Sequence, residues 1–215
     1  MQKSGRELNR NPAWAGLIFQ KKPCKILHCV AHFCKNETKF YNFKVSIKMT
    51  NIVLIGMPGS GKSTCGVLLA KATLKNFFDT DLLLQNLEGK RLQQILNSEG
   101  LSYFEKAEER AILSLNIEGT VIATGGSVVY SDTAMRHLQK LGTVVYMHIG
   151  FETMESRIKD LKTRGLAIAE GQSLLNMYNE RTPLYEKWAE KTVYCDGLTI
   201  DDTVEKIIEV LGLAV

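Results

Sequence analysis

Long apolar runs are absent from this chain of 215 residues. No stretch of eighteen consecutive apolar residues occurs, so the sequence predicts no membrane-spanning segment. Internal repeats and low-complexity segments are absent as well. What remains is a chain that is 45% apolar, which at this length can bury one sizeable core, and a single domain is therefore expected.

Basic charge is also scarce over most of the chain, although the net charge is +4. Residues 49–215 hold 17 Lys and Arg against 21 Asp and Glu, a net charge of −4. Residues 1–48 hold the other 10 basic residues against 2 Glu, a net charge of +8. A surface for nucleic acid would therefore have to lie in the first segment alone, and we expect no nucleic-acid partner for the rest.

Residues 1–48 lack a clear hydrophobic period. We expect them to form a disordered basic extension that does not pack on the domain made by residues 49–215. Three interpretations stay open for this extension: a targeting segment for an organelle, a regulatory tail, or a start codon assigned too early, with Met49 as the true start.

Cysteines are few, and three of the five lie in the extension. Two histidines lie beside them, but the Cys-x₄-Cys-x₄-Cys spacing matches no common structural zinc pattern. This group consists of Cys24, His28, Cys29, His32 and Cys34. The other two, Cys65 and Cys195, are typical of buried thiols in a reducing compartment, so we expect a cytoplasmic protein, with organellar targeting by the extension left open.

The stretch around which the chain is organised runs from Asn51 to Thr64. An unbroken apolar run, 52–55, predicts a strand buried on both faces. Gly56, four further residues and then Gly61-Lys62-Ser63 match a phosphate-binding loop, or P-loop, that joins such a strand to a helix. Glycines let backbone N–H groups point at a polyphosphate, Lys62 reaches its β- and γ-phosphates, and the Ser63 hydroxyl binds Mg²⁺. The predicted nucleotide-binding residues of the loop are Gly59, Ser60, Gly61, Lys62, Ser63 and Thr64.

Apolar runs and amphipathic stretches alternate after the loop. Strands are expected at 52–55, around 77–78, and at 120–124, 143–149 and 192–195, with helices between them. This alternation predicts a three-layer α/β/α fold with a five-stranded parallel sheet. Residues 173–181 and 183–190 are expected to form two helices, the second with Pro183 in its first turn. Residues 162–172 lack an apolar face and indicate a mobile lid.

Two carboxylates and two glycines follow predicted strands. Asp79 and Asp81 are two residues apart on an extended segment, so both can face one cleft at the carboxyl edge of the sheet. Beside a bound nucleotide, one carboxylate can hold the magnesium ion's water shell while the other takes a substrate hydroxyl. The alternative is that the pair caps the next helix. Gly125 and Gly126 end another strand and allow a small molecule to approach the backbone closely.

The order of these motifs resembles that of the shikimate kinases, a P-loop family. The resemblance covers residues 51–212, and the stretches that carry it are Gly56–Thr64, Phe78-Asp79-Thr80-Asp81, Thr124-Gly125-Gly126 and Arg181-Thr182-Pro183-Leu184-Tyr185. It implies an ATP- and Mg²⁺-dependent transfer of phosphate to a hydroxyl of shikimate or a similar small metabolite. It also implies roles for the side chains, which are Mg²⁺ binding by Asp79, binding and deprotonation of the acceptor hydroxyl by Asp81, lid closure by Arg164, adenine stacking by Arg157 and binding of the substrate carboxylate by Arg181.

The chain departs from the family pattern at Glu105, where the family has an arginine that also binds the carboxylate. An acid in a poorly solvated site turns attraction into repulsion, and Lys106 points about 100° away on a helix. The lid differs too, because Arg164 is followed by Gly165. A polyol, sugar acid or amine-bearing acceptor, and a non-catalytic nucleotide- or metabolite-binding module, therefore stay open as alternatives.

A GTPase switch is a further alternative, but no Asn-Lys-x-Asp element for guanine occurs in the sequence. Nor does a strand after the loop end in Asp-x-x-Gly. The sequence therefore favours a kinase, which we expect to act as a monomer on a small molecule.

Overall fold

The computed structural model describes residues 50–159, 167 and 171–213 of the chain. In these residues the strands form one parallel sheet of five, in the order β2-β3-β1-β4-β5. The strands are β1 (Asn51–Ile55), β2 (Asn76–Asp79), β3 (Thr120–Ala123), β4 (Gly142–His148) and β5 (Lys191–Tyr194). All five coincide with the predicted strands to within about two residues, and the predicted fold class is confirmed.

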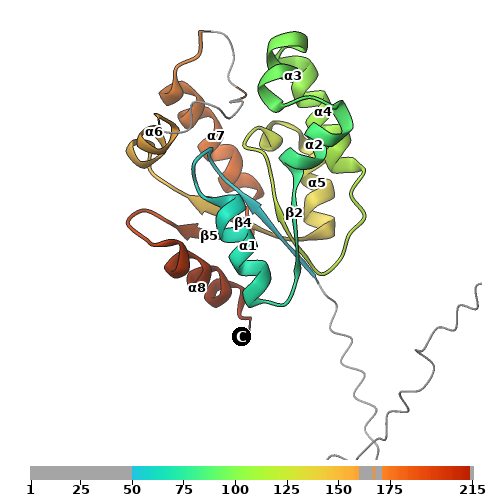
Figure 1. Cartoon of the computed structure of the whole chain (residues 1–215). Helices are drawn as coiled ribbons and strands as arrows, with labels where there is room; N and C mark the ends of the chain where they lie inside the picture. Colours follow the sequence, from blue (N-terminus) through green and yellow to red (C-terminus); the bar gives the residue numbers. More distant parts are fainter. Residues whose placement is uncertain (1–49, 160–166, 168–170, 214–215) are drawn as a thin grey trace, which may run out of the picture. The chain divides into compact units, whose positions relative to one another are not determined.

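Helices cover both faces of this sheet (Figure 1). They are α1 (Lys62–Ala72), α2 (Thr80–Glu88), α3 (Leu92–Glu99), α4 (Leu101–Leu113), the 3₁₀ turn η2 (Val128–Tyr130), α5 (Asp132–Leu141), α6 (Phe151–Lys159), α7 (Leu174–Trp188) and α8 (Ile200–Leu211). α1 and α8 pack together on one face, and α5 and α7 lie on the other. This division follows from the right-handed crossovers that connect parallel strands. After β1 the chain moves toward one edge of the sheet, to β2, and after β3 it moves toward the other edge, to β4. Crossovers of the same hand that run in opposite directions place their helices on opposite faces.

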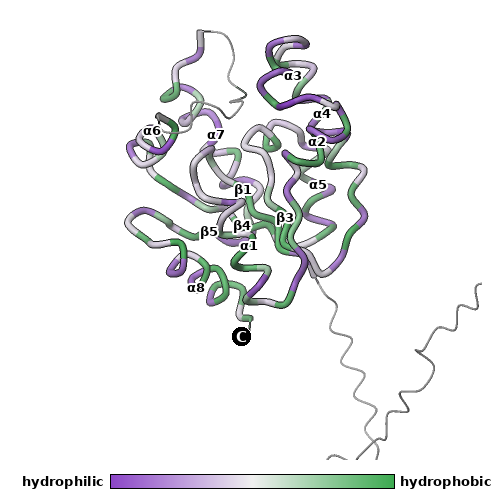
Figure 2. The backbone as a smooth tube through the Cα atoms, in the orientation of Figure 1, coloured by the Kyte–Doolittle hydropathy of each residue, from purple (hydrophilic) through white to green (hydrophobic). Residues whose placement is uncertain are grey.

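The core lies along the central strands, which Figure 2 shows as a hydrophobic band through the middle of the domain. Every residue of β1 and of β3 is buried, as strands enclosed by helices on both faces require. β1 pairs in parallel with both β3 and β4. Because all the strands run the same way, their carboxyl ends meet at one edge, where ligands bind in this architecture.

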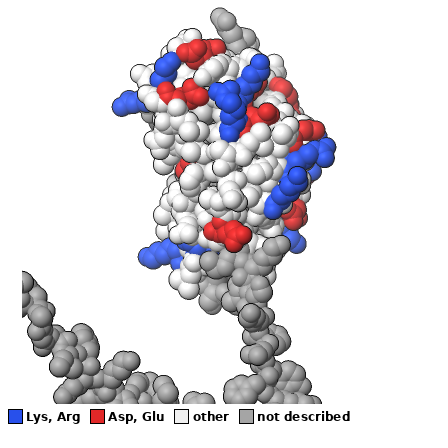
Figure 3. All heavy atoms as spheres, turned by 90° about the vertical axis from the view of Figure 1, so that its right-hand side faces the viewer, with Lys and Arg blue, Asp and Glu red and all other residues white. Residues whose placement is uncertain are grey.

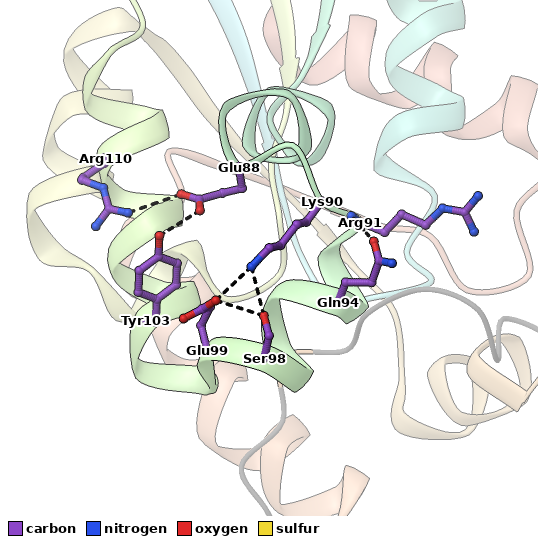
Figure 4. Close-up of polar contacts among 8 residues, drawn as sticks. All are labelled: Glu88, Lys90, Arg91, Gln94, Ser98, Glu99, Tyr103 and Arg110. Atoms are coloured by element: carbon purple, nitrogen blue, oxygen red, sulfur yellow. Dashed lines mark hydrogen bonds and ion pairs between the residues drawn. The ribbon is translucent and has the colours of Figure 1, made fainter.

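A smaller second core joins α2, α3 and α4 at that edge and consists of Leu84, Ile95, Phe104, Ala107 and Ala167. Polar contacts near the surface also link the same three helices (Figure 4). Glu88 at the end of α2 accepts hydrogen bonds from Tyr103 and Arg110 of α4. Lys90 pairs with Glu99 at 2.9 Å. These contacts are half-exposed or exposed, so they add little to stability, but they tie the helices to one another.

The prediction of two helices at 173–181 and 183–190 is wrong, because α7 continues through Pro183 as one helix. Its buried residues are Met177, Arg181, Tyr185 and Trp188. These are spaced four, four and three residues apart and form one stripe, so packing on both sides of Pro183 keeps the helix continuous. Pro183 has no N–H to donate, a local cost that the packing of the stripe outweighs.

Candidate active site

The P-loop joins β1 to α1 through three glycines with positive φ. The φ angles of Gly56, Gly59 and Gly61 are 147°, 80° and 92°, which other residues rarely adopt. Gly61 directly precedes α1, so no side chain caps the N-terminus of this helix. A turn of this shape, closed by a helix N-terminus without a capping side chain, suits a polyphosphate.

Two predicted cations lie at this loop. The Lys62 Nζ atom donates to the Gly56 and Met57 carbonyl oxygens at 2.8 and 2.9 Å and to the Ser60 hydroxyl at 3.4 Å. The Lys62 side chain is buried, so its charge is held inside the loop rather than in solvent. Arg157 on α6 donates from Nη1 to the Gly59 carbonyl at 3.0 Å. Both positive charges therefore lie at the loop that is predicted to hold the nucleotide.

A hydroxyl and a carboxylate meet beside the loop. Ser63 Oγ donates to Asp79 Oδ2 at 2.7 Å. Asp79 also caps α2, because its Oδ1 accepts from the Asp81 N–H at 2.9 Å. The capping alternative and the proposed magnesium role are therefore compatible. Oxygen donors of this kind fit Mg²⁺, which usually keeps several water ligands and takes few protein groups.

Two carboxyl groups converge on Gly125. A Cβ atom added to Gly125 would lie 2.9 Å from Asp81 Oδ1 and 2.1 Å from Glu108 Oε1. The two oxygens are therefore at most about 5 Å apart. The Gly125 N–H donates to the Thr80 hydroxyl at 3.2 Å. Glycine is required at position 125 because two side chains crowd it. The reason expected from the sequence was a different one, that a small molecule approaches the backbone closely.

Arg181 lies beside Gly126 and is almost fully buried. Its Nε donates to the Tyr130 hydroxyl at 3.2 Å, and its Nη2 donates to the Ala167 carbonyl. Nη1 lies 3.2 Å from where a Cβ of Gly126 would be. Burial opposes the charge, yet neighbouring Tyr185 and Tyr130 raise the pKa of Arg181, so the guanidinium stays charged beside Gly126.

Glu105 on α4 is half-buried and lines a hollow of about 190 Å³. Lys106, Glu108 and Tyr130 line the same hollow. Burial raises the pKa of Glu105, the charge of Arg181 lowers it, and Glu180 raises it. Glu105 therefore lies in the electrostatic field of the arginine that is predicted to bind the acceptor's carboxylate.

The structure brings the predicted residues together in two groups. Lys62, Ser63 and Asp79 meet at the P-loop. Asp81 and Arg181 flank Gly125 and Gly126. Arg164, predicted for the lid, lies outside the described residues, as does most of the predicted lid segment.

One residue of the site, Glu108, was not predicted from the sequence. Glu108 is fully buried, and its Oε2 accepts from Ser127 Oγ at 2.7 Å. A sequence signal existed, because Glu108 falls within the apolar stripe of α4. The other buried members of that stripe are Phe104, Ala107, Ala111 and Ile112. An acid in such a stripe is rarely buried without a specific reason.

The family model for shikimate kinase matches residues 58–212 of this chain. The chain belongs to the shikimate kinase family. A shikimate kinase of Sulfurihydrogenibium sp. (strain YO3AOP1) is 33% identical over 161 residues, which are 74% of this chain and 96% of that protein. A shikimate kinase of Tolumonas auensis is 34% identical over 167 residues, which are 76% of this chain and 97% of that protein.

Solved structures of shikimate kinases agree with this assignment. The enzyme from Acinetobacter baumannii in complex with shikimate has a TM-score of 0.71 and 29% identity, covering 76% of this chain and 93% of that one. The enzyme from Aquifex aeolicus has a TM-score of 0.66 and 34% identity, covering 75% and 96%. This shikimate kinase family member is thus an ATP-dependent kinase that acts on a hydroxyl of a small molecule and uses Mg²⁺, as the sequence predicted.

Proposed function

We propose that this enzyme transfers the γ-phosphate of ATP to a hydroxyl of shikimate. The observation that carries the proposal is that Asp81 lies beside Gly125 and Arg181 lies beside the adjacent Gly126. An acceptor bound there would present a hydroxyl to Asp81 and a carboxylate to Arg181. The relative from Acinetobacter baumannii, whose structure holds shikimate, supports this choice of acceptor.

Each side chain then has one task. The P-loop holds the triphosphate, with Lys62 near its β- and γ-phosphates and Arg157 near the adenine. Ser63 and Asp79 would hold Mg²⁺, which when bound neutralises charge on the phosphates. Asp81 orients the acceptor hydroxyl and accepts its proton. Positioning and charge neutralisation are the main requirements of phosphoryl transfer, and these side chains serve both.

Arg164 and Arg181 complete the set. We assign to Arg164 the closing of the site over the transferred phosphate, where a positive charge stabilises the transition state and water is excluded. Arg181 binds the acceptor carboxylate, because a guanidinium can donate two parallel hydrogen bonds to it. Its environment supports this role, since Tyr130 and the Ala167 carbonyl hold the group in place beside Gly126.

A coupled ADP-release assay with a panel of hydroxylated metabolites tests the acceptor. Shikimate should give the highest kcat/KM, ahead of polyols, sugar acids and amine-bearing analogues. The Asp81→Asn variant should lose orders of magnitude in kcat while still binding ATP, because only the group that orients the hydroxyl has changed. Turnover with another acceptor and none with shikimate would refute the acceptor, and ATP binding without any turnover would indicate a binding module.

We further propose that residues 49–215 form the whole catalytic domain and that residues 1–48 are dispensable for turnover. A chain that starts at Met49 should keep the kcat of the full chain. We also infer a monomeric, cytoplasmic enzyme without nucleic-acid partners. On the face shown in Figure 3 basic and acidic side chains are interspersed, which gives nucleic acid no continuous basic surface. Among the described helices, none has the length and apolar content to cross a membrane.

A further inference from the structure

The guanidinium group of Arg181 is held by contacts at two of its three nitrogen atoms. Nε donates to the Tyr130 hydroxyl at 3.2 Å, and Nη2 donates to the Ala167 carbonyl. The third nitrogen, Nη1, lies 3.2 Å from where a Cβ of Gly126 would be. A guanidinium has five N–H donors, so after these two hydrogen bonds donors remain on Nη1 and Nη2 for a carboxylate. The group is therefore turned so that its Nη1 end lies beside the glycine pair.

Tyr130 contacts this group through its ring as well as through its hydroxyl. The guanidinium carbon lies 5.1 Å from the centroid of the Tyr130 ring, within the range of a cation–π contact. Tyr130 is the last residue of η2, the turn that begins two residues after Gly126, and its N–H donates to the Ser127 carbonyl at 3.0 Å. The segment that supplies the glycine pair thus also holds Arg181 of α7, so a few residues of chain set the distance between the arginine and the glycines.

Glu105 offers Arg181 a competing partner. The family pattern has an arginine at position 105, so in this chain Arg181 has to bind the acceptor carboxylate without that second arginine. Burial raises the pKa of Glu105 and the charge of Arg181 lowers it, so the two groups interact. Yet no ion pair joins them among the residues that the structure describes. A guanidinium that lost its hold could turn toward this carboxylate, and the acceptor would then have to displace it.

We propose that Tyr130 is a positioning residue for acceptor binding, which holds the guanidinium of Arg181 beside Gly126 and away from Glu105. An arginine that is fixed before the acceptor arrives loses less side-chain freedom on binding, so the affinity for the acceptor is higher. In this chain one oriented arginine then serves where the family pattern has two. This inference rests on the proposed function and adds to it a residue that sets the affinity for acceptors bearing a carboxylate.

The first test compares the kinetic constants of the wild type and Tyr130→Phe, a variant that keeps the ring and loses only the hydroxyl. The KM of shikimate should rise about tenfold, because a hydrogen bond to a charged group is lost, while kcat and the KM of ATP change less than about twofold. Tyr178→Phe is the matched control, because Tyr178 lies three residues before Arg181 on α7 and its hydroxyl donates to the Ile149 carbonyl at 3.1 Å. The constants of the control should equal those of the wild type.

Two double variants test whether Tyr130 acts through Arg181. Arg181→Lys has no planar group for Tyr130 to orient, so adding Tyr130→Phe to it should not raise the KM of shikimate further. Glu105→Gln should lower this KM more in the Tyr130→Phe background than in the wild type, because it removes the partner toward which a released guanidinium turns. A hydroxyl with a merely structural role would give the same proportional effect in every background.

An acceptor analogue gives a further measurement. The carboxamide of shikimate has no carboxylate for Arg181 to bind, so Tyr130→Phe should leave the KM of this analogue unchanged. An unchanged KM of shikimate in Tyr130→Phe, an equal rise in the Arg181→Lys background, or an equal rise with the carboxamide would each refute the role of Tyr130. Turnover of shikimate by the wild type would still stand in those cases, so failure of this inference can be distinguished from failure of the proposed function.

Discussion

Glu108 should make the folding stability of the ligand-free enzyme fall as the pH rises. The pKa of its carboxyl group is raised from the ordinary value of 4.5 to about 7, chiefly by burial. Between these two values the unfolded chain has lost the proton and the folded chain has kept it. The unfolded state then binds fewer protons than the folded state, so the free energy of unfolding falls with rising pH across this window and levels off above pH 7.

The magnitude follows from the size of the shift. Each pKa unit corresponds to about 1.4 kcal/mol, so moving from pH 5.5 to pH 8 should cost this group about 2 kcal/mol. Glu108→Gln cannot ionise and avoids that cost. The stability of the variant relative to the wild type should therefore improve by about 2 kcal/mol over the same range, which for a domain of this size is about 4–8 °C in Tm.

Urea titration at pH 5.5 and pH 8 gives the free energies of unfolding for the wild type, Glu108→Gln and the control Glu88→Gln. Other titrating groups also change the free energy of unfolding of all three proteins with pH. The decisive quantity is therefore the difference in this free energy between variant and wild type at each pH. If that difference is the same at both pH values for Glu108→Gln, the carboxyl group does not titrate in this range, and the reasoning from its burial is refuted.

Three further predictions concern the packing of the acceptor side of the site, the packing between α1 and β2, and the charge near Arg181. Gly125→Ala places a Cβ 2.1 Å from Glu108 Oε1, so the KM of the acceptor should rise at least tenfold while the Kd of ATP, measured by fluorescence titration, is unchanged. Gly66→Ala places a Cβ 2.6 Å from the ring of Phe77, and overpacking between α1 and β2 should lower the free energy of unfolding by about 1–3 kcal/mol in urea titration. Glu105→Gln removes a negative charge from the field of Arg181, so the KM of an anionic acceptor should fall about fivefold, or about 1 kcal/mol, and an unchanged KM would show that Glu105 does not act on the acceptor.

Most of the nucleotide side of the site could be predicted because local chemistry determines it. The glycines of the P-loop occupy positions that require positive φ, and the residues of β1 are all buried, so sequence spacing and apolar pattern describe both. Local chemistry also determines the caps of two helices. Ser131 caps α5 through the Ala134 N–H, and Thr199 forms a capping box with Asp202 at the start of α8.

The errors arose where tertiary packing outweighs local preference. Pro183 favours a helix start when read alone, but buried residues on both sides of it hold α7 together. Glu108 reads as an ordinary helical acid until the fold places it beside Gly125 and Ser127, which are distant in the sequence. Asp79 shows the opposite case, since it performs the predicted capping and also meets Ser63.

The active site, with its P-loop and its acceptor side, is the part of this domain where stability is given up for function. It combines left-handed glycines, a buried lysine, a buried arginine and a buried carboxyl oxygen without a partner, each of which opposes folding. The fully buried residues of β1 and β3 lie immediately beneath it and pair with each other, so the rigid centre of the sheet can hold these groups in place. A bound acceptor carboxylate would pair with the buried charge of Arg181. A group that weakens the free enzyme is therefore one through which we expect the acceptor to stabilise it.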